Sequence, residues 1–589
     1  MERNTQQFLI PEKKIGNPNN TYDIYPSHHI SEGKINAGYK TLANKLISET
    51  TLILDGYIGV DWDEIINALT SLFKEKGKTF KAHDIKNFLR PEEEIHKIVT
   101  PFLGGDDPVF GSRTNINIQD YFDAEIIASI ELDGNVDIQM VYGTGASQCG
   151  IDGFLVYFDL PKNELQYRMR TGAIANLGFS AAKEAKQMYK HFYFVDWVVL
   201  NKEKKNLLPK ISIIVDQQRT GHPTWMSGKT LRNALSKMSK NHFRVRPWFE
   251  PGVWGGLWMM DKFSGLNKDV PNYAWSFEMI VPENGILFES EGNLLEVSFD
   301  MLMYQDRENI LGKAAKRFKD EFPIRFDFLD TFEGENLSVQ CHPRPDYIKK
   351  EFGENFTQDE TYYILDSGKD AEVYLGFQEG IDPDEFKRAL EDSFESKKTI
   401  DVVKYIQKFK AKKHDLFLIP HGTVHCSGKN NMVLEISATP YIFTFKMYDW
   451  QRLDLEGKPR PLNIDRAFEN LNFNRQGQTV LDTLVSKPVV EATGNNWKKI
   501  HLPTHKDHFY DIYRYEFEND IEIETKDQCH LLMLVEGTSI ELTVKDNFPQ
   551  TFHYAETFAI PAAARNYKLL NKGEGTAKVI VSFVKDEAC

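Results

Sequence analysis

The sequence predicts a multidomain protein in which an N-terminal α/β domain precedes mainly-β domains. At 589 residues the chain is too long for one hydrophobic core, so two to four domains are expected. Strand patterns alternate with helical patterns in the first part of the chain, which favours a parallel sheet. Strand patterns dominate later. We expect domains at residues 1–225, 226–480 and 481–589.

The first domain shows its strands as apolar runs. Thr51–Gly56 reads as a buried strand that ends at a glycine turn, and a helix with acidic residues in its first turn opens near Asp61. Phe154–Asp159 reads as a second strand, and the helical pattern of Lys162–Arg170 follows it. Lys210–Asp216 is a third strand. These elements predict a parallel α/β sheet.

The second domain combines strand patterns with a helical insertion. Pro323–Asp330 alternates apolar and polar residues, as a half-buried strand does. Asp382 and Pro383 form a helix start, with an Asp cap and Pro at the first position. We therefore expect a helical insertion near residues 382–410.

The third domain reads as all-β. Leu531–Gly537 and Glu556–Ala563 are strand–turn units. His530 stands without other ligand-type residues in a comparable spacing, so a structural role is expected for it. We expect this domain to bind no metal.

Composition restricts the classes of partner and location. Hydrophobic content of 41% and charged content of 27% are ordinary for a globular protein, and the net charge of −15 disfavours non-specific nucleic-acid binding. Five scattered cysteines do not resemble a disulfide framework. Met1–Gln7 lacks the apolar core of a signal peptide, and no apolar run is long enough to span a membrane. A cytoplasmic location is expected.

Four residues form a candidate metal site. Gln340 and His342 are two residues apart in a strand pattern and so share one face. Glu360 and His425 lie in two further strand-like segments. Two imidazoles, a carboxylate and an amide oxygen suit zinc or another divalent first-row metal. The alternative is that each histidine is an ordinary structural residue.

The segments around these residues resemble the type I mannose-6-phosphate isomerases, a family of zinc-dependent cupins. The resemblance rests on Gln340-Cys341-His342-Pro343, on Glu360 before an aromatic strand, and on Ile419-Pro420-His421-Gly422-Thr423-Val424-His425. It extends from about Trp254 to the C-terminus and includes Val373–Phe377.

The resemblance implies a double cupin, that is, two β-helix jelly rolls, with one Zn²⁺ per chain held by Gln340, His342, Glu360 and His425. It implies interconversion of mannose 6-phosphate and fructose 6-phosphate by proton transfer through an enediol, with a small sugar phosphate as partner. Lys446 is then the expected catalytic residue, a cation for the phosphate, with Arg452 as a further candidate.

Several positions depart from the family pattern. Lys446 replaces an arginine, so the charge is kept but the two-pronged hydrogen-bonding geometry is lost. Gln358 replaces a lysine, and Ala438–Tyr441 replaces an Asn-Ser-Asp run. His421 is an added imidazole that fits an acid–base role or a turn-stabilising one. An isomerase of another sugar and a non-catalytic sugar-binding regulator therefore remain as alternatives.

The N-terminal domain resembles a nucleoside kinase or other P-loop domain through Asp159–Glu164, Arg168 and Arg170. A working phosphate loop needs G-x-x-x-x-G-K-[ST], whereas Gly56 is followed by a segment with Asp61 and Asp63 in place of the lysine and the hydroxyl residue. We interpret it as a degenerate, non-catalytic kinase-like domain. An unrelated α/β domain is the alternative, and an active kinase is disfavoured.

Overall fold

The computed structural model describes residues 1–17, 21–454, 457–545 and 548–589. The chain divides into two compact units. Unit 1 comprises Met1–Gly16, Tyr25–Met238 and Pro282–Asp306, and unit 2 comprises Asn17–Ile24, Ser239–Val281 and Arg307–Cys589.

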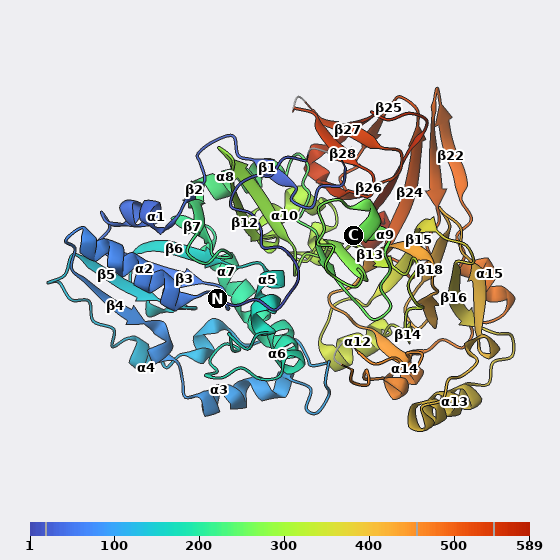
Figure 1. Cartoon of the computed structure of the whole chain (residues 1–589), viewed down its shortest axis with the longest axis horizontal. Helices are drawn as coiled ribbons and strands as arrows, with labels where there is room; N and C mark the ends of the chain where they lie inside the picture. The colour runs from blue at the N-terminus through green and yellow to red at the C-terminus, as the bar shows by residue number, and fades with distance from the viewer. Residues whose placement is uncertain (18–20, 455–456, 546–547) are drawn as a thin grey trace. The chain divides into compact units, whose positions relative to one another are not determined.

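The first unit is an α/β domain (Figure 1). Its helices and strands are β1 (Ser27–His29), β2 (Asn36–Ala37), α1 (Tyr39–Leu46), β3 (Thr51–Gly56), α2 (Trp62–Glu75), β4 (Phe80–Asp84), α3 (Glu92–Val99), α4 (Ala124–Ile127), β5 (Ile138–Tyr142), β6 (Phe154–Asp159), α5 (Lys162–Met169), α6 (Ala185–His191), α7 (Trp197–Leu207), β7 (Ile213–Asp216), β8 (Thr224–Ser227), α8 (Gly228–Met238), β11 (Gly285–Ser290), β12 (Asn293–Ser298) and the start of α10 (Asp300–Leu311).

A seven-stranded sheet in the order β2-β8-β7-β6-β3-β5-β4 forms the centre of the described part of unit 1. The strands from β7 to β4 pair in parallel, and β8 and β2 pair antiparallel at one side. The predicted strands correspond to β3, β6 and β7, and Asp61 caps α2 by accepting from the backbone N–H of Glu64. The predicted parallel α/β sheet is confirmed.

A three-stranded sheet in the order β1-β11-β12 completes the strands of unit 1. Strands β11 and β12 come from Pro282–Asp306, a segment that the sequence interpretation placed in the second domain. Because this association joins residues far apart in sequence, local patterns do not reveal it. The three sequence-based boundaries stay a prediction.

Unit 2 is mainly β. Its elements are β9 (Trp248–Glu250), α9 (Trp258–Lys262), β10 (Trp275–Met279), α11 (Ala315–Phe318), β13 (Arg325–Asp330), β14 (Val339–Cys341), α12 (Pro345–Phe352), β15 (Asp359–Ser367), β16 (Glu372–Phe377), α13 (Pro383–Ser396), β17 (Ile406–Lys410), β18 (Leu416–Ile419), β19 (His425–Ser427), β20 (Asn431–Ala438), β21 (Phe445–Tyr448), α14 (Ile464–Asn470), α15 (Gln478–Thr483), β22 (Val489–Gly494), β23 (Trp497–Leu502), β24 (Tyr510–Phe517), β25 (Asp520–Glu524), β26 (His530–Glu536), β27 (Ser539–Val544), β28 (Gln550–His553), β29 (Thr557–Ile560), β30 (Asn566–Asn571) and β31 (Ala577–Val584).

Two pairs of sheets organise the described strands of unit 2. The first pair, here called the first barrel, has the orders β18-β15-β20-β13-β10-β9 and β17-β16-β19-β14-β21. The second pair, the second barrel, has the orders β22-β23-β24-β31-β26-β29 and β25-β30-β27-β28, and apolar residues of both sheets share one core. The predicted helical insertion is α13, where Asp382 accepts from the backbone N–H groups of Asp384 and Glu385.

Strand β13 differs from its prediction. Its alternating residues predicted a half-buried strand, yet all six residues of Arg325–Asp330 are buried. The prediction of a solvent-facing side was wrong because β13 is an interior strand that pairs with both β10 and β20. The polar side chains of β13 therefore lie inside the protein and need polar neighbours there.

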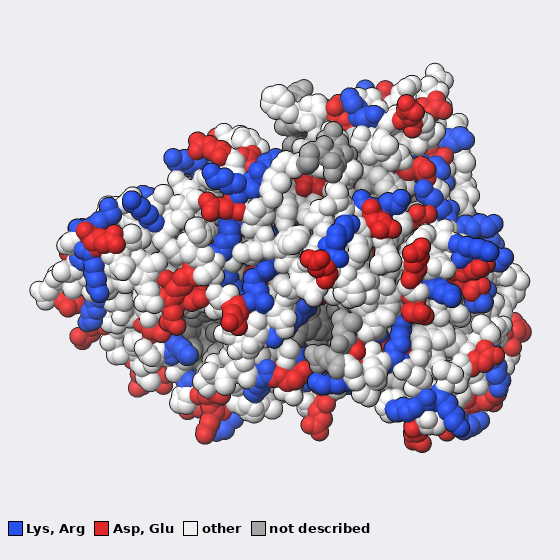
Figure 2. All heavy atoms as spheres, viewed as in Figure 1, with Lys and Arg blue, Asp and Glu red and all other residues white. Residues whose placement is uncertain are grey.

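The surface of the molecule carries both signs of charge. Figure 2 shows basic and acidic side chains interspersed over the viewed face. Among the described residues, no helix combines the length and the apolar character that crossing a membrane requires.

Candidate metal centre and the N-terminal glycine turn

The four predicted ligands meet inside the first barrel. Glu360 lies on β15 of one sheet, His425 begins β19 of the other sheet, and His342 directly follows β14. Gln340 on β14 pairs with His425 across the strands. Ligand atoms of His342, Glu360 and His425 all lie within 4.8 Å of one another. Segments separated by up to 85 residues thus present their side chains to one point.

Glu360 lies close to both histidines of the candidate site, His342 and His425. His342 Nε2 lies 3.1 Å from Glu360 Oε2, and His425 Nε2 lies 2.8 Å from Glu360 Oε1. The other ring nitrogens face backbone carbonyls: His342 Nδ1 is 2.9 Å from the Phe443 oxygen and His425 Nδ1 is 2.9 Å from the Thr423 oxygen. A donating Nδ1–H leaves the Nε2 lone pair of a neutral imidazole for a metal, as metal-binding histidines require.

The donor set fits a divalent cation. His342 Nε2 and Glu360 Oε1 are buried without a hydrogen bond of suitable geometry, although each lies close to another polar atom of the site. Gln340 Nε2 lies 3.4 Å from His425 Nε2. Because the two ends of an amide are interchangeable in assignment, the opposite rotamer directs the amide oxygen of Gln340 to the same point. Two imidazoles with two oxygen donors suit zinc.

Electrostatic interactions at the site shift the pKa values of Glu360 and His342. Burial raises the pKa of Glu360, but His342 and His425 outweigh this effect and hold that pKa well below its usual range. Burial lowers the pKa of His342, yet the Glu360 carboxylate outweighs burial and raises it. The carboxylate is therefore ionised and draws positive charge to the site, which a divalent cation would supply in place of protons.

Two neighbours of Glu360 support the site. Gln358 Nε2 donates to Glu360 Oε2 at 2.9 Å, and this bond orients the carboxylate. His421 Nδ1 lies 2.9 Å from Asp359 Oδ1, and the same oxygen accepts from the backbone N–H of His421. Gln358 thus contacts a proposed ligand directly, whereas His421 contacts Asp359, the residue beside that ligand.

Sequence reasoning did not identify two buried carboxyl groups near the site. Asp327 on β13 stands opposite Glu435 on β20, and Glu435 stands opposite Tyr362 on β15, two residues beyond Glu360 on the same face. Burial, and then the charge of Glu360, raise the pKa of Asp327 well above its usual range. The alternation of apolar and polar residues along β13 was the sequence signal that could have identified Asp327, because it placed the polar residues on one face.

The two predicted phosphate-binding cations have different surroundings. Lys446 pairs with Gln340 across β21 and β14, so it shares the face of a proposed metal ligand, and it is half-buried. Arg452 donates to Asp449 at 2.5 Å and to the carbonyl of Asn336 at 2.6 Å. These bonds give Arg452 a structural function, and Lys446 is the better placed of the two.

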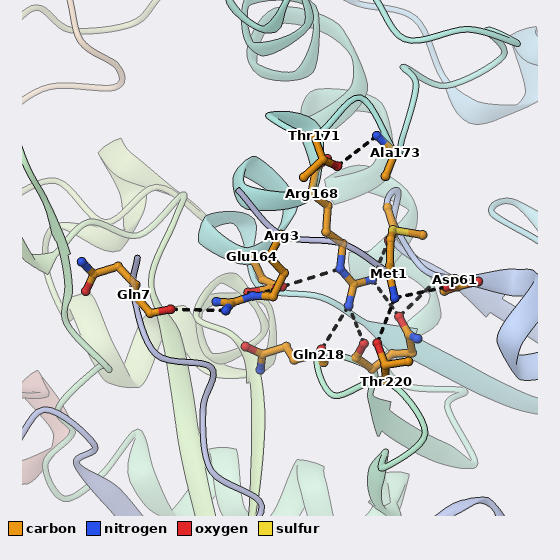
Figure 3. A network of polar contacts seen from close by, with 12 residues as sticks. Met1, Arg3, Gln7, Asp61, Glu164, Arg168, Thr171, Ala173, Gln218 and Thr220 are labelled. Atoms are coloured by element: carbon orange, nitrogen blue, oxygen red, sulfur yellow. Dashed lines mark hydrogen bonds and ion pairs between the residues drawn. The ribbon is translucent and has the colours of Figure 1, made fainter. Parts of the chain in front are cut away.

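The glycine turn of unit 1 is held by a buried arginine (Figure 3). Arg168 Nη1 donates to the Gly59 carbonyl at 2.8 Å and to Gln217 Oε1 at 2.9 Å. Its Nη2 donates to the carbonyls of Gln217 and Gln218 at 2.8 and 3.2 Å. Arg3 donates to Glu164 at 2.7 and 2.9 Å. The guanidinium expected to resemble a kinase arginine is thus bonded to the protein's own backbone.

His530 of the second barrel is buried, and its Nδ1 lies 2.9 Å from the Tyr567 hydroxyl. Burial lowers the pKa of His530 to about 3, so the imidazole is neutral at physiological pH. In the described residues, the group of histidine, cysteine and carboxylate side chains that meets the spacing of a metal site is the triad of the first barrel.

The chain is similar in sequence to mannose-6-phosphate isomerases. The sequence is 26% identical over 339 residues to the probable mannose-6-phosphate isomerase GmuF of Bacillus subtilis, covering 57% of this chain and 98% of that protein. It is 23% identical to the mannose-6-phosphate isomerase ManA of the same organism, covering 58% of this chain and 98% of ManA. These similarities support homology between a large part of this chain and mannose-6-phosphate isomerases.

Two further matches concern structure and the N-terminal region. The crystal structure of the mannose 6-phosphate isomerase from Bacillus subtilis aligns with a TM-score of 0.47 and 20% identity, covering 58% of this chain and 99% of that one. A family model described as a domain of unknown function, DUF8485, matches residues 38–240. That segment lies almost wholly in unit 1.

Proposed function

We propose that this chain is a metal-dependent aldose–ketose isomerase that interconverts mannose 6-phosphate and fructose 6-phosphate. The observation that carries the proposal is the convergence of His342, Glu360 and His425, with Gln340 beside them, in a chain similar to mannose-6-phosphate isomerases. The alternative of a non-catalytic regulator shares the metal site, so turnover is the property that separates the two.

One Zn²⁺ per chain, held by Gln340, His342, Glu360 and His425, is the proposed cofactor. When bound, such an ion polarises a carbonyl or hydroxyl oxygen and so stabilises the negative charge that develops during isomerisation. The Nδ1 atoms of the two histidines, fixed on backbone carbonyls, would keep the rings oriented. Gln358 would fix the carboxylate of Glu360 by its 2.9 Å bond.

The reaction moves one proton from carbon 2 to carbon 1 of the sugar and another between the two oxygens, through an enediol. The protein must hold the sugar with both carbons at the acid–base groups. Lys446, on the same face as Gln340, is the proposed catalytic-site cation for the phosphate.

The test is a product-resolved isomerase assay on the wild-type protein beside His342→Ala. We expect mannose 6-phosphate and fructose 6-phosphate to interconvert with the wild-type protein only when metal is bound, and we expect the variant to lose both metal and turnover. A metal-loaded wild-type protein that converts neither sugar phosphate would contradict the proposal.

For unit 1 we propose a degenerate nucleoside-kinase-like domain that does not transfer phosphate. Its supports are the parallel sheet, the glycine turn after β3, and the use of Arg168 in holding that turn. Counted from Gly56, Trp62 stands where a phosphate-binding lysine is needed, and Asp61 caps α2. If the purified protein hydrolyses ATP and mutation of Asp61 abolishes this hydrolysis, the interpretation is wrong.

Partner and location follow as further proposals. A small sugar phosphate is the proposed ligand, and the absence of nucleic-acid partners stays a prediction supported by the net charge of −15. We propose a cytoplasmic location. All five cysteines are free, and two of them, Cys341 and Cys426, are buried, which suits a reducing compartment.

A further inference from the structure

The second barrel is open on one side where the first barrel is closed. Taken in chain order, its strands β22 to β31 repeat the arrangement of β9, β10 and β13 to β20: the order β22-β23-β24-β31-β26-β29 corresponds to β9-β10-β13-β20-β15-β18, and β25-β30-β27-β28 corresponds to β14-β19-β16-β17. Strand β21 pairs with β14 in the first barrel, but among the described strands nothing takes its place beside β25. Strand β25 is therefore an edge of the second barrel.

A cleft of about 470 Å³ lies beside this edge and is lined by both sheets of the second barrel. One sheet contributes Trp497, Lys499 and Tyr515, and the other contributes the residues of β25. Lys499 is opposite Tyr515 where β23 pairs with β24, and Trp497 is two residues from Lys499 on the same face. The volume lies within the range of small-molecule sites, about 300–1,000 Å³.

The two aromatic residues of the cleft have polar atoms that the protein does not use. Trp497 and Tyr515 are half-buried and pack against the shared core of the barrel. Within the described part of the chain, neither the indole N–H of Trp497 nor the hydroxyl of Tyr515 has a hydrogen-bond partner. The hydroxyl of Tyr513, two residues away on β24, donates to Glu491 at 3.1 Å. The polar atoms of Trp497 and Tyr515 are thus available to a molecule in the cleft.

The charges of the cleft favour a ligand without phosphate. Lys499 and Asp520 are each matched by an ion pair with a residue outside the cleft, at 2.9 and 3.0 Å. Glu522, Glu524 and Lys526 also line the cleft, and they form no ion pair with another described residue. Two carboxylates against one ammonium group disfavour an anion, whereas carboxylate oxygens readily accept hydrogen bonds from hydroxyl groups.

We infer that this cleft binds an uncharged sugar, with the sugar ring against Trp497 and Tyr515 and its hydroxyl groups bonded to Glu522 and Glu524. The C–H groups of a sugar ring carry a small positive partial charge, which suits the negative face of an aromatic ring. Sugar hydroxyl groups donate to carboxylates and accept from an indole N–H. The inference goes beyond the proposed isomerase and does not depend on it, because the metal ligands lie in the first barrel.

The experiment titrates mannose, glucose and maltose into the full-length protein by saturation-transfer NMR, with and without removal of metal by a chelator. Glu522→Gln removes a charge from an exposed residue, with the exposed Glu574→Gln as its matched control outside the cleft. Tyr515→Phe removes a hydroxyl, with Tyr513→Phe as its control. We expect Glu522→Gln to weaken sugar binding about 10- to 150-fold and Tyr515→Phe about 2- to 13-fold, with both controls close to wild type.

The outcomes decide the inference without reference to the isomerase. Sugar binding that survives metal removal and weakens in Glu522→Gln, but not in Glu574→Gln, would support it. No saturable binding of any of the three sugars, or equal affinities in Glu522→Gln and Glu574→Gln, would overturn it. Tighter binding of mannose 6-phosphate than of mannose to the metal-free protein would contradict the charge argument.

The exposed edge of β25 provides one further test. If a second copy of the chain pairs with β25, sedimentation will show a dimer and the backbone amides of β25 will be protected from hydrogen exchange. That result, together with absent sugar binding, would replace the sugar site by an interface between two copies. Turnover of mannose 6-phosphate is measured on the same samples, and its absence would contradict the proposed function alone.

Discussion

Replacing Arg168 with methionine tests how the glycine turn of unit 1 is held. The side chain is 1% exposed and donates four hydrogen bonds, to the carbonyls of Gly59, Gln217 and Gln218 and to the Gln217 side chain. Methionine fills part of the volume but donates none of these bonds. The four oxygen acceptors then lose this donor, and Gln217 Oε1 alone among them keeps a side-chain acceptor role, for the backbone N–H of Asp61.

The expected cost follows from the contacts. Each lost bond costs about 1 kcal/mol, so four give about 4 kcal/mol, consistent with the 3–5 kcal/mol typical of breaking a buried charged interaction. Glu164, 3.7 Å from Arg168, keeps its bonds to Arg3 and so adds little. A loss of this size is a large share of the 5–15 kcal/mol that usually stabilises a domain.

The assay is proteolysis across a urea series, with the cleaved peptides of unit 1 identified by mass spectrometry. Arg168→Met should shift the midpoint of unit 1 by about 1–2 M urea. Arg170→Met, at the end of the same helix and only partly buried, is the control and should shift it little. Equal midpoints for the two variants would refute the reasoning. Loss of a measurable nucleotide affinity on mutating Arg168 would instead indicate a phosphate-binding role.

Three further predictions concern unit 2. His530 is neutral in the fold, with a pKa of about 3 against about 6.5 when unfolded, so its contribution to the free energy of unfolding is complete above pH 6.5 and is lost as the pH falls. Between pH 7 and pH 5, thermal unfolding of the wild-type protein should show a loss of about 2 kcal/mol more stability than that of His530→Gln. Parallel plots of stability against pH for the two proteins would contradict this. Asp382→Ala should lower the free energy of unfolding by about 0.5–2 kcal/mol and speed hydrogen exchange of the backbone amides in α13, while leaving turnover unchanged. Unaltered exchange would show that the Asp382 cap does not stabilise the helix. In steady-state kinetics, Lys446→Met should raise KM for mannose 6-phosphate at least tenfold, whereas Lys446→Arg should not. If Lys446 lies outside the phosphate site, the two variants will show the same KM.

The sequence predicted those parts of the fold that depend on local patterns. Continuous apolar runs identified β3 and β6, and acidic residues at the start of a helical pattern identified the beginning of α2 near Asp61. Gln340 and His342 could be placed on one face because side chains alternate along a strand. These features depend on neighbouring residues and therefore do not require knowledge of the tertiary fold.

The remaining features depend on strand pairing between distant segments. The Asp327–Glu435 pair joins positions 108 residues apart, and nothing local to either residue specifies that register. For the same reason the alternation in β13 was interpreted as a solvent-facing side, whereas its polar residues line the interior. The inclusion of Pro282–Asp306 in unit 1 is a further long-range association.

Elemental analysis of the purified, dialysed protein tests whether the ligand set of the first barrel binds zinc. We expect one zinc ion per chain in the wild-type protein, because the ligand set lies in the first barrel and His530 of the second barrel is bonded to Tyr567. We expect near-complete loss of zinc in His425→Ala and full retention in His530→Gln. A wild-type protein that binds no stoichiometric metal after zinc loading, or a His425→Ala variant that retains it, would contradict the account.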